Sequence, residues 1–97
     1  MSKRLQPKQF QAVGFDQCYG AACSVAKEHK GKVVQLAGSP DYPNADERWK
    51  DIPPKHRQHY VAKVGSSYVD VAHGQFDPST PVRISDSHGW TKEYEVD

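Results

Sequence analysis

The sequence predicts a small α+β domain in which an N-terminal helix packs on a small antiparallel sheet. A helical pattern of small and apolar residues runs from Gln17 to about Lys30. Short runs rich in Val, Tyr and Ile follow it, separated by segments that contain glycine, proline and serine. The resulting order of helix, strand, loop, hairpin and one or two further strands is typical of the α+β class.

Length and composition predict a single soluble domain over residues 1–97. The 97 residues are 36% apolar and 26% charged, with a formal net charge of +1. A chain of this length forms one domain with a modest core. The mean hydropathy of −0.83 predicts no membrane-spanning segment, and the polar start of the chain lacks the pattern of a secretory signal. Residues 1–14 are predicted to be a loose lead-in.

The helix has start and stop signals at both ends. Asp16 is expected to cap its N-terminus, because Asp side chains accept hydrogen bonds from the free N–H groups of a first turn. Cations occupy the last turn, where the helix dipole favours them, and Gly31 is the expected stop. The positions that recur at helical spacing are Tyr19, Ala22, Cys23 and Ala26.

The strands are predicted from β-branched and aromatic runs. Residues 37–54 contain four prolines, so an ordered loop is expected there, with Asn44 capping a short helical turn and Trp49 anchoring the loop on the core. The predicted strands are Lys32–Leu36, Tyr60–Val64, Tyr68–Val71, Val82–Ile84 and Thr91–Val96.

Two cysteines lie on the predicted helix. Cys18 and Cys23 are five residues apart, which places their Cα atoms roughly 8 to 9 Å from each other, beyond the limit of about 7 Å for a disulfide. We therefore expect two thiols. Cys18 lies in the first turn, where free N–H groups and the helix dipole lower a thiol pKa, whereas Cys23 lies among apolar residues and is expected to be an inert core residue.

A thiolate nucleophile needs a base and a group that orients this base, and the predicted hairpin offers His59 and Asp70. A two-residue type II′ turn at Gly65–Ser66 would pair Val61 with Asp70, so that Asp70 and His59 are diagonal neighbours on one face. A three-residue turn would separate them. With the two-residue turn, the opposite face of the hairpin would carry the apolar set Tyr60, Ala62, Val64, Val69 and Val71.

The stretch Asp16-Gln17-Cys18-Tyr19 resembles the nucleophile region of papain-like and transglutaminase-like enzymes. The runs that begin at His59 and at Tyr68 resemble their histidine strand and the aspartate strand after it. The resemblance covers about half the chain, from Gly14 to Lys30 and from His59 to Phe76. It is closest to the compact papain-fold toxin domains of bacterial polymorphic toxins and secreted effectors.

The resemblance implies a role for each matched residue. Cys18 would be the nucleophile, His59 the general base and then acid, and Asp70 the group that holds the imidazole. The sequence departs from the family where Tyr19 replaces the usual Trp and where Ala12 replaces the Gln that donates to the oxyanion in papain. Candidate oxyanion donors are the Cys18 backbone N–H and the side chains of Gln11, Gln17 and Gln75.

The resemblance also implies a thiol-dependent enzyme that acts on a carboxamide of a target-cell protein, as a deamidase, a transglutaminase or a protease. The chain would be the catalytic domain from the C-terminal end of a larger toxin or effector. This protein would leave the producing bacterium and act in the cytoplasm of a target cell, and a cognate immunity protein would neutralise it in the producer. No cofactor, metal, nucleic acid or membrane partner is expected.

Two alternatives remain open from the residues alone. A histidine-based ribonuclease could use His59 and His73 if the hairpin turn had three residues. A non-enzymatic interaction module could dock a partner through the proline-rich loop 41–54. The charge is bipolar, with +5 over residues 1–63 (11 Lys/Arg against 6 Asp/Glu) and −4 over residues 64–97 (2 against 6), which suits a protein partner better than nucleic acid. His56 and His59 lack the spacing of a closed zinc site, and His88 is expected in a turn.

Overall fold

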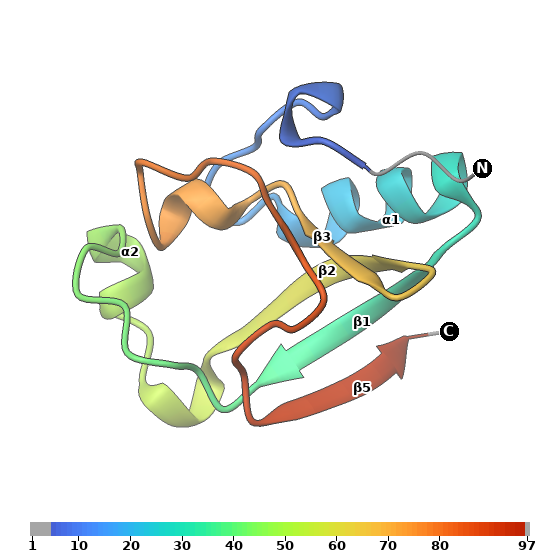
Figure 1. Cartoon of the computed structure of the whole chain (residues 1–97). Coiled ribbons are helices and arrows are strands. Elements are labelled where there is room, and N and C mark those ends of the chain that lie inside the picture. Colours follow the sequence, from blue (N-terminus) through green and yellow to red (C-terminus); the bar gives the residue numbers. More distant parts are fainter. Residues whose placement is uncertain (1–4, 97) are drawn as a thin grey trace.

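One main helix packs against a five-stranded antiparallel sheet in the computed structural model, which describes residues 5–96 (Figure 1). The strand order is β4-β3-β2-β1-β5, and every neighbouring pair is antiparallel. The predicted α+β class with an N-terminal helix on a small antiparallel sheet is confirmed. The helices and strands are α1 (Cys18–His29), β1 (Lys32–Ala37), α2 (Glu47–Lys50), β2 (Gln58–Val64), β3 (Ser67–Asp70), β4 (Arg83–Ser85) and β5 (Lys92–Val96).

The ends of α1 differ from the prediction by one residue. Gln17 occupies the N-cap position in place of Asp16, whose φ of 68° is left-handed and does not fit the extended backbone of an N-cap. At the other end Lys30 adopts the left-handed conformation expected of Gly31, and the N–H groups of both residues donate to the carbonyl of Ala26. Helix α1 therefore starts at Cys18, one residue later than predicted, and ends at His29.

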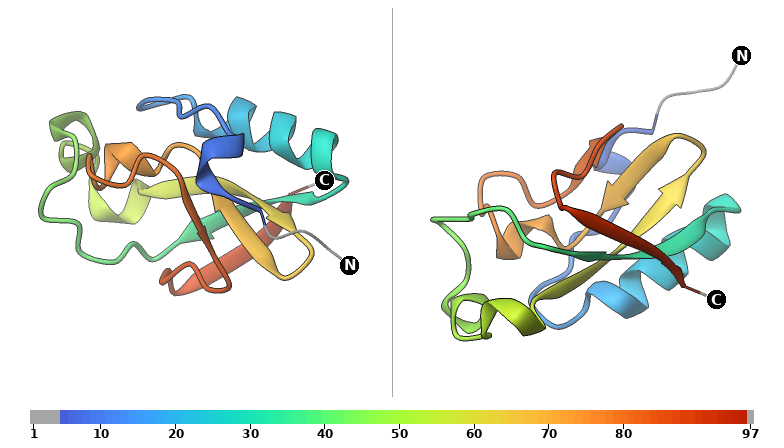
Figure 2. Two further views of the ribbon diagram at one scale, coloured as in Figure 1. Left: turned by 45° about the horizontal axis from the view of Figure 1, so that its top comes forward. Right: turned by 90° about the horizontal axis from the view of Figure 1, so that it is seen from below.

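Helix α1 covers one face of the sheet, as the views in Figures 1 and 2 show. Val25 and Ala26 pack there against the strand residues Ala62 and Val69 and against Val71, which directly follows β3. The expected loose lead-in also packs on this cluster, because Phe10 and Val13 contact it and the Val13 N–H donates to the Val71 carbonyl at 2.9 Å. Residues 1–4 of that segment lie outside the described residues.

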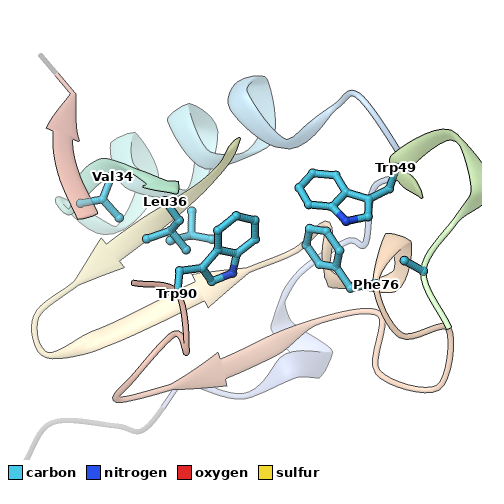
Figure 3. Close-up of a cluster of buried hydrophobic side chains, with 7 residues drawn as sticks. Val34, Leu36, Trp49, Phe76 and Trp90 are labelled. Atoms are coloured by element: carbon cyan, nitrogen blue, oxygen red, sulfur yellow. The ribbon is translucent and has the colours of Figure 1, made fainter. Parts of the chain in front are cut away.

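The opposite face of the sheet is covered by the short helix α2 and by loop residues. Figure 3 shows this cluster, in which the ring of Phe76 lies beside Trp49; the buried members are Val34, Leu36, Ala45, Trp49, Val61, Phe76 and Trp90. Trp49 anchors α2, as predicted, but the cap of α2 is Asp46 rather than Asn44. The Asp46 carboxylate accepts a hydrogen bond from the Arg48 N–H at 2.8 Å. Asn44 lies two residues before this N-cap position and does not occupy it.

The predicted hairpin is confirmed in its register. Val64 pairs with Ser67, which leaves the two-residue turn Gly65–Ser66 between β2 and β3. Gly65 has a φ of 61° and Ser66 is not left-handed, which is the pattern of a type II′ turn. None of the helices within residues 5–96 is long and apolar enough to cross a membrane.

Candidate active site

The topology brings Cys18, His59 and Asp70 to the same end of the sheet. Helix α1 runs antiparallel to β1, so its first residue lies near the end of β1 and the start of β2 (Figure 1). His59 is the second residue of β2, and Asp70 is the last residue of β3, beside it in the hairpin. All three residues that the sequence singled out therefore meet.

His59 and Asp70 form a buried pair. His59 is only 1% exposed and Asp70 is 9% exposed, and Nε2 of the histidine lies 2.9 Å from Oδ2 of the carboxylate. Burial alone would raise the pKa of Asp70, but His59, with a smaller contribution from His73, lowers it to about 2. Burial would likewise lower the pKa of His59, but Asp70 and Cys18 raise it to about 9. The pair is therefore an imidazolium and a carboxylate near pH 7.

Aromatic rings enclose the imidazole of His59. Phe76 meets it edge to face at 4.9 Å between centroids, and Trp90 stacks on it at 5.8 Å with an interplanar angle of 22°. Both ring nitrogens are buried, and neither makes a hydrogen bond of standard geometry, although Nε2 lies 2.9 Å from the Asp70 carboxylate. With Nε2 facing Asp70, Nδ1 is the ring nitrogen left for an interaction with Cys18.

Cys18 is the partly exposed member of the group. Burial raises its pKa, but hydrogen bonding and charge from His59, together with the backbone of Tyr60, outweigh this and leave the pKa below its ordinary value. The position of Cys18 at the start of α1 adds free backbone N–H groups that favour an anion. The geometry therefore favours a thiolate–imidazolium pair.

Cys23 differs from the expectation of an enclosed core residue, because it is partly exposed and is not a member of the cluster that contains Val25 and Ala26. The neighbouring Cys23 thiol raises the pKa of the Tyr19 hydroxyl one turn earlier. Tyr19 is itself 49% exposed and its ring lies 4.9 Å from that of Tyr60. The residue that follows Cys18 is therefore an exposed aromatic ring.

The three glutamines suggested as oxyanion donors have different surroundings. Gln75 is buried, and its Nε2 donates to the Ala72 carbonyl at 3.0 Å, so it holds the chain after β3. Gln11 is exposed outside any helix or strand. Gln17 precedes the nucleophile, and its side-chain oxygen accepts from the Gly14 N–H at 2.9 Å, which leaves its amide nitrogen as a donor. Gln17 is thus the glutamine best placed beside Cys18.

Two residues of the site escaped the sequence analysis in these roles. His73 binds Asp70, with Nδ1 at 3.2 Å from the same Oδ2 that faces His59. Trp90 covers His59 from the loop before β5. The hairpin turn has two residues, yet His59 and His73, the two histidines of the ribonuclease alternative, still lie close together because both contact Oδ2 of Asp70. His88 lies in the irregular segment between β4 and β5, where its Nδ1 accepts from the Trp90 N–H at 2.9 Å.

Among residues 5–96, no group of three or more His, Cys, Asp and Glu side chains is arranged to hold a metal ion. Two hollows in the surface, of about 510 and 760 Å³, are lined by residues other than Cys18, His59 and Asp70. Comparison with protein-family models, curated proteins and solved structures finds no match to this chain.

Proposed function

We propose that the chain is a thiol-dependent enzyme that attacks a carboxamide carbon of a target protein with Cys18. The observation that carries the proposal is the position of this partly exposed thiol, at the start of α1, against the buried pair of His59 and Asp70. A nucleophile, a base and a group that orients the base are the parts that acyl transfer through a thioester requires.

The reaction then follows in two halves. The thiolate of Cys18 forms a bond to the carboxamide carbon, and the C–N bond breaks as His59 gives its proton to the nitrogen, which leaves as ammonia. In the second half, water attacks the thioester carbon while neutral His59 takes its proton, and the C–S bond breaks to restore the thiolate and imidazolium. A primary amine in place of water gives a crosslink instead of an acid.

The burial of His59 favours a small leaving group. The imidazole is 1% exposed and lies between Phe76 and Trp90, so a departing group reaches it only beside the sulfur of Cys18. Ammonia fits such an opening more easily than the amino end of a cleaved peptide. This supports deamidation or transglutamination of a glutamine or asparagine side chain over proteolysis.

The toxin or effector role is part of the same proposal and rests on the resemblance to compact papain-fold toxin domains. The enzyme would be delivered into the cytoplasm of a target cell, and the producer would hold a neutralising immunity protein. The bipolar charge, positive over residues 1–63 and negative over residues 64–97, supports a protein as the partner.

Growth of a bacterial host that expresses the chain tests the proposal, together with intact-mass analysis of host proteins. Cys18→Ala should abolish toxicity, whereas Cys23→Ala, a matched change on the same helix, should keep it. Deamidation should raise the mass of a target protein by about 1 Da per site, because an NH₂ group is replaced by OH. Toxicity that survives Cys18→Ala in a folded chain would exclude thiol catalysis.

A further inference from the structure

We propose that His73 is a positioning residue of this site, which holds the Asp70 carboxylate toward His59 by donating a hydrogen bond to the oxygen that the two histidines share. This inference rests on the proposed function. His73 does not face Cys18 and is not needed for the chemical steps themselves, so its role would be exerted through Asp70.

The carboxylate of Asp70 is held from three sides. Its Oδ2 lies 2.9 Å from Nε2 of His59 and 3.2 Å from Nδ1 of His73, and its Oδ1 accepts from the Ala72 N–H at 3.1 Å. A carboxylate held at only one oxygen can rotate about its Cβ–Cγ bond. With His73 and Ala72 on different oxygens, that rotation would break one of two hydrogen bonds, so Oδ2 stays directed at His59.

The protons in this cluster fix the role of each ring. An ionised carboxylate only accepts, so both nitrogens that face Oδ2 must carry a hydrogen. His59 presents Nε2–H to Asp70 and uses Nδ1 for the exchange with Cys18. His73 presents Nδ1–H, so in its neutral form it donates to Asp70 without adding a second positive charge to the cluster.

His73 is itself fixed by its surroundings. It begins the short 3-10 helix His73–Gln75 after β3 and is 7% exposed. Its ring meets those of Tyr42 and Phe76 at 6.1 and 5.8 Å, so it has little freedom to turn away from Asp70. Asp77, the other carboxylate close to His73, is bonded to Ser79 and Thr80 and does not compete for the Nδ1 hydrogen.

The test is the rate at which iodoacetamide alkylates Cys18 at about pH 6, where only an activated thiol is ionised. The experiment uses the full-length chain with the substitution Cys23→Ala, so that Cys18 is the sole thiol. His73→Leu should slow alkylation about fivefold, the factor that matches the loss of one net hydrogen bond. His73→Asn should restore most of the rate, because the Asn side-chain nitrogen takes the place of Nδ1.

Two comparisons separate positioning from a merely structural effect. In an Asp70→Asn background, His73→Leu should change the rate no further, because its effect passes through Asp70. If the Leu variant does not fold, the alkylation rates of the His73→Asn and His73→Gln variants are compared instead. Gln places its side-chain nitrogen near the position of Nε2, so Cys18 in this variant should still be alkylated about fivefold more slowly. Equal rates for Asn and Gln, or an undiminished effect in the Asp70→Asn background, would overturn the inference.

The outcomes also distinguish this inference from the proposed function. If Cys18 is alkylated no faster than an ordinary thiol in the Cys23→Ala chain, the activated nucleophile is absent and the proposed function fails. If Cys18 is reactive and slowed by Asp70→Asn, yet indifferent to every His73 variant, the proposed function stands and only the role of His73 is rejected.

Discussion

Asp70 carries a charge inside a small protein, where removing a carboxylate from water is costly. The charge is retained because two imidazole rings and one backbone N–H surround it. A buried ion pair of this kind contributes little net stability, since the cost of removing both charges from water offsets the Coulomb attraction between them. What it provides is a fixed direction for the His59 imidazole, which the thiol of Cys18 requires in the proposed function.

Asp70 should make the folded state sensitive to acid. Its pKa is lowered from 3.8 to about 2, so the unfolded chain binds a proton first as the pH falls. The stabilisation is therefore present above about pH 4 and is lost as the pH falls through 2, with an amount on the order of 2 kcal/mol. Urea unfolding of wild type and Asp70→Asn should show a shallower loss between pH 4 and 2 in the variant. If the free energies of unfolding of the two proteins fell in parallel between about pH 4 and 2, the lowered pKa of Asp70 would be contradicted.

The residues that the sequence could predict are those that a regular element positions. Cys18 follows from the start of a helix, and the two-residue turn at Gly65–Ser66 fixes which face His59 and Asp70 share. His73 lies in a short 3-10 helix after β3 and Trp90 in the irregular segment before β5, and no extended periodic pattern there indicates where a side chain points. Their contacts with Asp70 and His59 depend on tertiary packing, which a single sequence does not reveal.

At the scale of elements, the join between α1 and β1 is a point where two backbone segments approach closely. Gly31 lies between them, and a Cβ built on it would come within 2.5 Å of the Lys63 carbonyl oxygen on β2. The glycine is required by close approach to a backbone atom, since Lys30 rather than Gly31 has the left-handed conformation. The join sets the height at which α1 lies over the sheet, and with it the position of Cys18.

Gly31→Ala should therefore destabilise the fold by about 1–3 kcal/mol, because strand β2 or the join itself must shift to admit the methyl group. Gly20→Ala in α1 is the matched control. A Cβ at Gly20 meets nothing within 4 Å, so this change should stabilise by up to about 1 kcal/mol through helix propensity. Thermal unfolding measures both. Equal effects of the two substitutions would contradict the steric argument.

The elements were predictable where a pattern of several residues defines them. The strand order could not be predicted, since nothing in the runs states that β5 pairs with β1 rather than with β4. The predicted caps were wrong, because Asp16 has a left-handed φ and the cap of α2 is Asp46, two residues after Asn44. The lead-in was misjudged because Phe10 and Val13 are too widely spaced to form a recognisable strand or helix, although both pack on the core.

In the whole molecule, two apolar clusters share the central strands of one sheet. The cluster under α1 uses Ala62 and Val69, while the cluster with Trp49 and Trp90 uses Val61, the residue next to Ala62. Neither cluster can form independently of the other face, because both clusters contain a residue of β2. The site depends on both layers too, since Cys18 comes with the helix and His59 is covered by Trp90 from the other face.

This arrangement predicts that the molecule unfolds as one unit. Val25→Ala removes two methyl-sized groups from the cluster under α1 and should lower the free energy of unfolding by about 2 kcal/mol. The fluorescence of the two tryptophans, both on the opposite face, should report the same lowered urea midpoint as far-UV circular dichroism, which follows helix α1. Ser24→Ala, an exposed change on the same helix, should leave both midpoints in place. Separate midpoints for the two probes in the Val25→Ala chain would show that the faces unfold independently, and the thiol would then lose its histidine before the aromatic cluster opens.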